Sequence, residues 1–403
     1  MKINNISNYG RDIRRWTLTY AVRSLPDTVC RTCFFSAFVF CSLLYAAEPG
    51  TESMEFLRMP EGARQIAMGE AGAVSRDAMS LWWNPAGISW TENSEIGLSH
   101  SGMYEGVSDQ CLSVAVPVKG EIKNYGVLGV GLRVMDYGDV QGYGTGGTSE
   151  TVYEPSGRAL SLGYGLNFLN GNMAAGLALK SISENLGQVS GGGFGTDIGF
   201  MYKVSGGDWS LGEPLYMGLS MQNLGASVNY ESKAETVVQM TRLGFGWGKD
   251  IGENRLETVM DYFSPSSGDG GMSLGFEWRM KKIFNIRLGH KMSGATDAGS
   301  GLRAGFGMDM LNFSFDYAYG GYGELGASHT LGVGIKFGKV ISLEGIGGGG
   351  AVSPAETFKR AMQYYNEGKY PEAVLEFNKV LDAEPTNEKA MEYMKKASEK
   401  IEK

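Results

Sequence analysis

Apolar and polar residues alternate along fourteen segments between about residues 93 and 337. In the segment 311–319, for example, every second residue is a large apolar one, and the residues between them are Asn, Ser, Asp and Ala. A period of two places alternate side chains on opposite faces of a strand. An even number of long strands with aromatic ends, behind an export signal, is typical of closed barrels that are apolar toward lipid and polar toward the lumen. The pattern therefore predicts an all-β membrane protein, a 14-stranded antiparallel transmembrane β-barrel spanning residues 93–338.

The connections between the predicted strands alternate in length. Short connections at 119–123, 169–170 and 281–283 contrast with long ones at 137–157, 183–194 and 225–236. Outer-membrane barrels have this asymmetry, with tight periplasmic turns and longer outside loops. The predicted strands cover residues 94–101, 109–118, 124–136, 158–168, 171–181, 195–204, 214–223, 237–247, 255–263, 272–279, 284–290, 300–309, 311–319 and 328–337.

Composition agrees with this interpretation. The 61 glycines show no collagen-like period, and many fall on the face opposite the apolar one. No stretch after residue 50 approaches the roughly 18 apolar residues that a membrane helix needs. The net charge of -8 opposes nucleic-acid binding, which requires a basic surface.

The first 46 residues read as a signal peptide with a long amino-terminal region. Arg31 precedes the apolar run Cys33–Ala46, which is too short to cross a membrane as a helix and ends in small residues. We expect cleavage after Ala46 or Ala47, which would leave Cys111 as the single thiol of the mature chain. Processing as a lipoprotein at Cys41 is the alternative.

Charged residues of both signs fall on the predicted lumen face. Such charges are costly unless they are paired or wetted. They therefore form either an ion-pair lattice that braces the wall or a polar path for a solute, and the sequence does not pair them. The residues are Arg133, Lys180, Asp197, Lys203, Arg242, Glu257, Asp261, Glu277, Arg279, Arg287, Arg303, Asp309, Asp316 and Lys336.

Residues 47–92 differ from the barrel segments and predict a plug inside it. Their many small residues permit close packing in a confined space. Asp77 precedes a stretch with helical spacing, so a short helix capped by Ser75 or Asp77 is expected. Asn84-Pro-Ala-Gly has turn chemistry, because Pro fixes one φ and Gly can take a positive one.

These residues resemble the amino-terminal signature of the PorV/PorQ family, within the larger group that resembles the fatty-acid channel FadL. The resemblance covers about residues 54–338 and implies a barrel with an N-terminal plug. In FadL-like channels the plug gates hydrophobic molecules that leave through a lateral opening, whereas PorV-like members of type nine secretion systems receive exported proteins. The residues that carry the resemblance are Gly62, Ala63, Met68, Gly69, Asp77, Asn84, Pro85, Ala86 and Gly87.

The carboxyl-terminal residues depart from the family pattern. Residues 339–352 are Gly-rich and predict a flexible linker. Residues 353–403 begin with a capping box and resemble one tetratricopeptide repeat (TPR) followed by a capping helix at about 387–401. This module would lie in the periplasm, as a partner-binding unit or as a solvated tail. Its repeat positions are Tyr364, Gly368, Tyr370, Ala373, Phe377 and Pro385.

Nothing in the sequence predicts catalysis or a cofactor. His100, His290 and His329 lie on three separate segments without metal-ligand spacing. The Gly-rich runs do not open a helix after a strand, so a nucleotide site is not predicted.

We therefore expect a non-enzymatic outer-membrane barrel. Its partners would be membrane lipid and exported or periplasmic proteins, in the manner of PorV. The alternative is a FadL-like channel for uptake or efflux of hydrophobic small molecules.

Overall fold

The structure is a computed structural model of the 403-residue chain. The residues that it describes are 52–119, 124–143, 147, 149–204, 214–230, 233–293, 301–338, 341–342, 354–384 and 387–401. The predicted signal peptide, Pro385 and most of the predicted linker therefore lie outside the described residues. The chain divides into one unit of Met1–Val116 with Val127–Gly338, and a second of Pro117–Gly126 with Lys339–Lys403.

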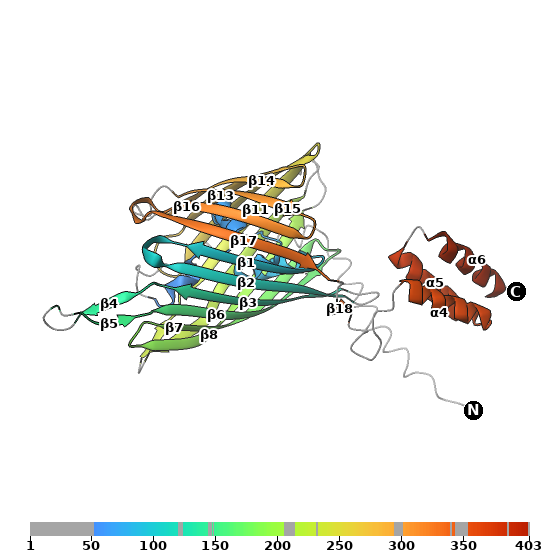
Figure 1. The fold of residues 1–403 in the computed structure, drawn as a ribbon, viewed down its shortest axis with the longest axis horizontal. Coiled ribbons are helices and arrows are strands. Elements are labelled where there is room, and N and C mark those ends of the chain that lie inside the picture. Colours follow the sequence, from blue (N-terminus) through green and yellow to red (C-terminus); the bar gives the residue numbers. More distant parts are fainter. Residues whose placement is uncertain are drawn as a thin grey trace, which may run out of the picture. The chain divides into compact units, whose positions relative to one another are not determined.

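Fourteen antiparallel strands form a closed barrel, in agreement with the sequence prediction (Figure 1). Neighbours in sequence are neighbours in the sheet, and β1 closes the ring by pairing with both β2 and β17. The strands of the ring are β1 (Ser94–Gly102), β2 (Ser108–Lys119), β3 (Asn124–Asp136), β6 (Ser156–Phe168), β7 (Met173–Asn185), β8 (Ser190–Val204), β9 (Leu215–Tyr230), β11 (Met240–Ile251), β12 (Asn254–Pro265), β13 (Gly271–Met280), β14 (Phe284–Ser293), β15 (Leu302–Met310), β16 (Phe313–Gly321) and β17 (Ala327–Phe337).

The predicted long loops are shorter and more ordered than expected. The stretch 137–157 contains a two-stranded ribbon, β4 (Val140–Tyr143) with β5 (Ser149–Tyr153). Strands β7, β8 and β9 also extend into the predicted loops, and β10 (Lys233–Thr236) pairs with the end of β9. Gly- and Ser-rich segments lack the apolar alternation by which we placed strand ends, although their backbone still pairs. A short β18 (Ile341–Ser342) lies parallel to β2.

The two ends of the barrel differ in their connections. One end carries the connections β3–β6, β7–β8 and β9–β11 and is called here the long-loop end. The other carries the turns β6–β7, β13–β14 and β15–β16 and is called the short-turn end.

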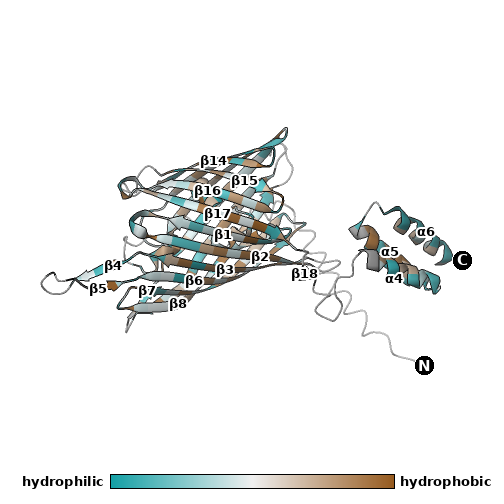
Figure 2. Ribbon diagram, viewed as in Figure 1, coloured by the Kyte–Doolittle hydropathy of each residue, from teal (hydrophilic) through white to brown (hydrophobic). Residues whose placement is uncertain are grey.

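The outward face of the wall is apolar. Phe306, Phe315 and Leu331 point out from neighbouring strands and are 61%, 47% and 60% exposed. Figure 2 shows apolar and polar residues alternating along the strands of the barrel. No helix of the described residues is both long and apolar enough to cross a membrane.

Residues 52–93, called here the N-terminal segment, lie inside the ring of strands (blue in Figure 1). The segment contains η2 (Glu55–Arg58), α3 (Ala63–Ala67), η3 (Ala78–Trp82) and η4 (Pro85–Trp90). Asp77 caps η3 by accepting a hydrogen bond from the amide of Ser80. The Asn84-Pro-Ala-Gly motif starts η4 rather than forming an isolated turn, because Asn84 caps the amide of Ala86 and Pro85 suits the first helical position.

The carboxyl-terminal part forms three helices, α4 (Pro354–Asn366), α5 (Tyr370–Ala383) and α6 (Glu388–Ile401). Ala373 and Phe377 are fully buried in their common core, whereas Tyr364 and Tyr370 are partly buried. Gly368 follows α4 with a positive φ of 76°, which glycine adopts at little cost. A small residue and an aromatic one thus fill the centre of the module.

Opposite faces of one strand should respond differently to charge. Phe315→Arg places a guanidinium toward lipid and should cost about 2–4 kcal/mol of stability if it lies near the midplane. Ser314→Arg on the neighbouring lumen position should cost much less, because Ser314 lines a polar cavity. The heat-modifiability of the folded band on gels measures both, and equal loss for the two variants would contradict a lipid-facing sheet.

Candidate functional site

The N-terminal segment runs through the lumen from one end of the barrel to the other. At the long-loop end Ser53 forms a parallel bridge with Val237, and its amide donates to the carbonyl of Thr236 at 2.9 Å. At the short-turn end the indole of Trp90 donates to the carbonyl of Gly171 at 3.2 Å. The segment therefore stands between the two openings.

Glycines on the inner wall make room for the segment. A methyl group at Gly176 or Gly199 would overlap Pro85 or Asn84, and one at Gly289 would overlap the backbone of Gly69. These contacts leave no space for a side chain, so the segment and the wall fit each other closely. Many glycines on the polar face of the strands are thus explained by packing against this segment.

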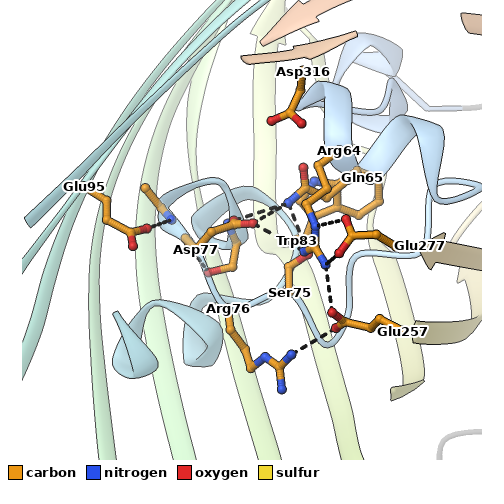
Figure 3. A network of polar contacts seen from close by, with 12 residues as sticks. Arg64, Gln65, Ser75, Arg76, Asp77, Trp83, Glu95, Glu257, Glu277 and Asp316 are labelled. Carbon is orange, nitrogen blue, oxygen red and sulfur yellow. Dashed lines mark hydrogen bonds and ion pairs between the residues drawn. The ribbon is translucent and has the colours of Figure 1, made fainter. Parts of the chain in front are cut away.

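Arg64 is the main ionic contact between the segment and the wall (Figure 3). Its guanidinium lies 3.0 Å from Glu277 of β13, 3.2 Å from Glu257 of β12 and 3.8 Å from Asp77. Arg76 also pairs with Glu257, at 3.0 Å. These pairs are largely shielded from water, so the loss of one partner would leave a buried charge uncompensated.

Two carboxylates of the segment form further ion pairs with other parts of the wall. Glu70 accepts from Arg303 of β15 at 2.8 Å and from Lys291 of β14 at 2.6 Å. Glu61 pairs with the fully buried Arg133 of β3. Arg64 and Glu70 contact the four neighbouring strands β12 to β15, whereas Glu61 contacts β3 on another side of the ring, so the segment is held on two sides.

Backbone groups of the segment add further hydrogen bonds. Asp261 of β12 accepts from the amides of Gly72 and Ala73, each at 2.8 Å. The side chain of Asn84 is fully buried and donates to the carbonyl of Ala73 at 2.7 Å. A buried irregular backbone needs such partners, because an unpaired polar group is costly away from water.

The predicted lumen charges divide into groups. Glu277, Arg279, Arg287 and Asp316 form one connected network on the inner wall, and Glu257 joins it through Arg64 of the segment. Asp197 pairs instead with Lys180 at 2.7 Å, outside that network. Arg133, Asp261 and Arg303 contact the N-terminal segment individually.

The structure also places the residues that resemble the PorV/PorQ signature. Asp77, Asn84 and Pro85 cap or begin helices, while Met68 and Ala86 belong to one buried cluster. A methyl group at Gly62, Gly69 or Gly87 would overlap neighbouring protein atoms. Ala63 lies against Gly332 of the wall, where an added methyl group would be 3.1 Å from the Ala63 side chain. Glu61, Arg64, Glu70 and Arg76 were not predicted from the sequence as site residues. The available signal was their charge within a segment otherwise rich in small and apolar residues.

A cavity of about 470 Å³ lies at the short-turn end of the lumen. Arg64, Arg76, Arg287, Glu257 and Asp316 are among its lining residues. The cavity is therefore polar and carries charges of both signs.

Apolar side chains, several of them methionine, form a buried cluster beneath the long-loop end, beside the buried ion pairs of Arg133 with Asp109 and Glu61. Met54, Met79 and Met135 form a buried cluster there with Phe56 and Trp82, and further apolar residues pack on it from the mouth. This group is called here the mouth cluster; its other members are Trp83, Cys111, Ala159, Ile182, Ala226, Val228 and Val237, with Leu57, Met59, Met103, Val107, Tyr137 and Tyr230 packed against them. Methionine is flexible and polarisable, so such a cluster can reshape around apolar guests.

No protein-family model and no curated protein matches the chain. Among solved structures it is similar to the Ralstonia pickettii toluene transporter TbuX, with 12% identity and a TM-score of 0.49 over 69% of this chain and 99% of that one. It is also similar to the CymD monoaromatic hydrocarbon channel (14%, 0.45, 70% and 98%) and to a Pseudomonas aeruginosa FadL homologue (8%, 0.43, 70% and 99%).

The close fit between wall and segment predicts a local effect of a single methyl group. Gly289→Ala should displace the segment and destabilise the barrel by about 1–3 kcal/mol, as overpacking does. Gly102→Ala is the matched control, since nothing lies within 4 Å of the added atom. Thermal unfolding in detergent measures both variants, and equal midpoints would show that the segment does not press on the wall.

Proposed function

We propose that the chain is an outer-membrane channel for hydrophobic small molecules, gated by the N-terminal segment acting as a plug. The observation that carries the proposal is the apolar, methionine-rich mouth cluster beneath the long-loop end of a lipid-facing barrel. We propose no catalytic role and no cofactor for it.

The outer-membrane location rests on the wall itself. Its outward face presents large apolar side chains around a closed ring, and hydrocarbon is the solvent that such a surface matches. A closed ring also leaves no unpaired strand edge in lipid. Outer-membrane barrels have their long loops outside and their tight turns in the periplasm. We therefore infer that the long-loop end faces outside and the short-turn end faces the periplasm.

The two halves of the lumen suit different solutes. Contact with the mouth cluster would stabilise an apolar guest. In the charged cavity at the short-turn end the same guest would displace water from charged groups without replacing their hydrogen bonds, which is unfavourable. We therefore expect a hydrophobic guest to leave through the wall before it reaches that cavity.

The wall between β8 and β9 supports such an exit. Its ladder shifts register between Phe194 and Thr196 and again before Ile198, and Asn223 opposite has a positive φ of 59°. Ala226 and Val228 of the mouth cluster lie on the same part of β9. An interrupted ladder opens at lower cost than a continuous one, because fewer backbone bonds are lost.

Protein export or envelope assembly with protein clients, of the PorV/PorQ type, is the second candidate function. The ordered α4–α6 module favours it, because Leu375 and Met391 are exposed apolar residues on a unit of the size and helical form of a repeat. This TPR-like module would then bind a partner in the periplasm.

Uptake of a hydrophobic dye tests the first candidate. Cells that produce the protein should take up N-phenylnaphthylamine faster than cells without it. Met103→Gln, which places an amide against the mouth cluster, should lower that rate several-fold. Met310→Gln is the matched control, because Met310 is 51% exposed at the end of β15.

The opposite result would favour the second candidate. If dye uptake does not depend on the protein, and polypeptides copurify with the full chain but not with a chain ending at residue 352, the small-molecule proposal is wrong.

A further inference from the structure

A single carboxylate joins two tyrosines over the mouth cluster. Glu184, near the end of β7, is 8% exposed, and its two oxygens accept hydrogen bonds from different sides. The hydroxyl of Tyr137 donates at 2.6 Å and that of Tyr230 at 2.7 Å.

The three residues span five neighbouring strands. Tyr137 follows β3 and Tyr230 ends β9, while Glu184 lies on β7, the middle strand of the series β3, β6, β7, β8 and β9. Each tyrosine therefore reaches inward across one intervening strand, and the hydrogen bonds form a strap over the inner surface of this part of the wall.

Glycines make this strap possible. The residues paired with Glu184 on its two sides are Gly157 of β6 and Gly191 of β8. A methyl group at Gly191 would lie 2.7 Å from the ring of Tyr230, and one at Gly157 would lie 2.8 Å from the ring of Phe56. Without side chains at these positions, aromatic rings can lie over the strands.

The chemistry of the strap makes it stable but reversible. Among the described residues, Glu184 has two hydroxyl donors and no ion-pair partner. Burial, followed by the hydrogen bond to Glu184, raises the pKa of Tyr137 well above its ordinary value, so this hydroxyl remains a donor. Hydrogen bonds to a buried carboxylate are stronger than neutral ones, yet water can replace both hydroxyls when the mouth opens.

Both tyrosines also pack on the mouth cluster. We propose that Tyr137, Glu184 and Tyr230 form a latch that closes the outer mouth and must open to admit a hydrophobic molecule. This proposal rests on the proposed function, because it assigns control of access to the same cluster. A latch differs from a simple brace in that breaking it raises access to the lumen more than it lowers the stability of the barrel.

The rate at which a reagent labels the native thiol measures how easily small molecules reach the mouth cluster. Cys111 belongs to the mouth cluster, is 4% exposed and is the free cysteine of the described residues. An impermeant maleimide added to intact cells should label it slowly in the parent protein. Tyr137→Phe and Tyr230→Phe should each raise the labelling rate about tenfold, as expected for one lost charge-assisted hydrogen bond.

The matched control is Tyr153→Phe. The hydroxyl of Tyr153, on the β4–β5 ribbon, accepts a hydrogen bond from Gln188 at 2.5 Å, away from Glu184. Its loss should leave labelling unchanged. Gly191→Ala supplies a second test, because the added methyl displaces the ring of Tyr230 without removing its hydroxyl, and it too should speed labelling. Cys111→Ser gives the background.

Two measurements separate the latch from the proposed function. Faster labelling of both Tyr→Phe variants, with unchanged thermal midpoints and faster dye uptake, supports both proposals. Faster labelling without any protein-dependent dye uptake supports the latch as a closure but overturns the proposed cargo. Labelling rates equal to those of Tyr153→Phe overturn the latch, whatever the dye shows.

Discussion

The ion pairs of Arg64 with Glu257 and Glu277 join the two parts on which the rest of the structure depends, the barrel wall and the segment within it. A ring of fourteen strands encloses a lumen that must be filled by side chains, by chain or by water. Here the chain fills much of it, and buried charges on the wall are compensated by charges of the opposite sign on the segment. Because a half-broken buried pair is costly, the segment has one strongly preferred position.

The same arrangement divides the lumen into two environments. A polar cavity lies at the short-turn end, whereas methionine and aromatic side chains gather beneath the long-loop end beside the buried ion pairs of Arg133 and of Arg303. Inner-wall glycines allow the segment to lie against the strands between these regions. The proposed function rests on this asymmetry, because an apolar mouth would accept apolar molecules that a charged cavity would not.

The sequence predicted the barrel well because alternation is a local property: all fourteen ring strands were found, and positions such as Phe315 and Leu331 were placed on the outer face. The β4–β5 ribbon and the extended ends of β7–β9 were missed, since Gly- and Ser-rich strands carry little alternation. Contacts between side chains far apart in the sequence could not be predicted, for a different reason. Arg64 meets Glu277 across 213 residues, and Tyr137 reaches Glu184 of β7 across the intervening strand β6. Such contacts depend on register, which the sequence does not display.

Conductance across a planar bilayer tests most directly whether Arg64 holds the segment in the lumen. Arg64→Met keeps the length of the side chain but removes its pairs with the wall, whereas Arg58→Met, the matched control, removes only a pair with Glu55 within the segment. We predict frequent channel openings for Arg64→Met and a quiet bilayer for the parent protein and Arg58→Met. A folded, inserted Arg64→Met barrel that stays as quiet as the parent would contradict this prediction.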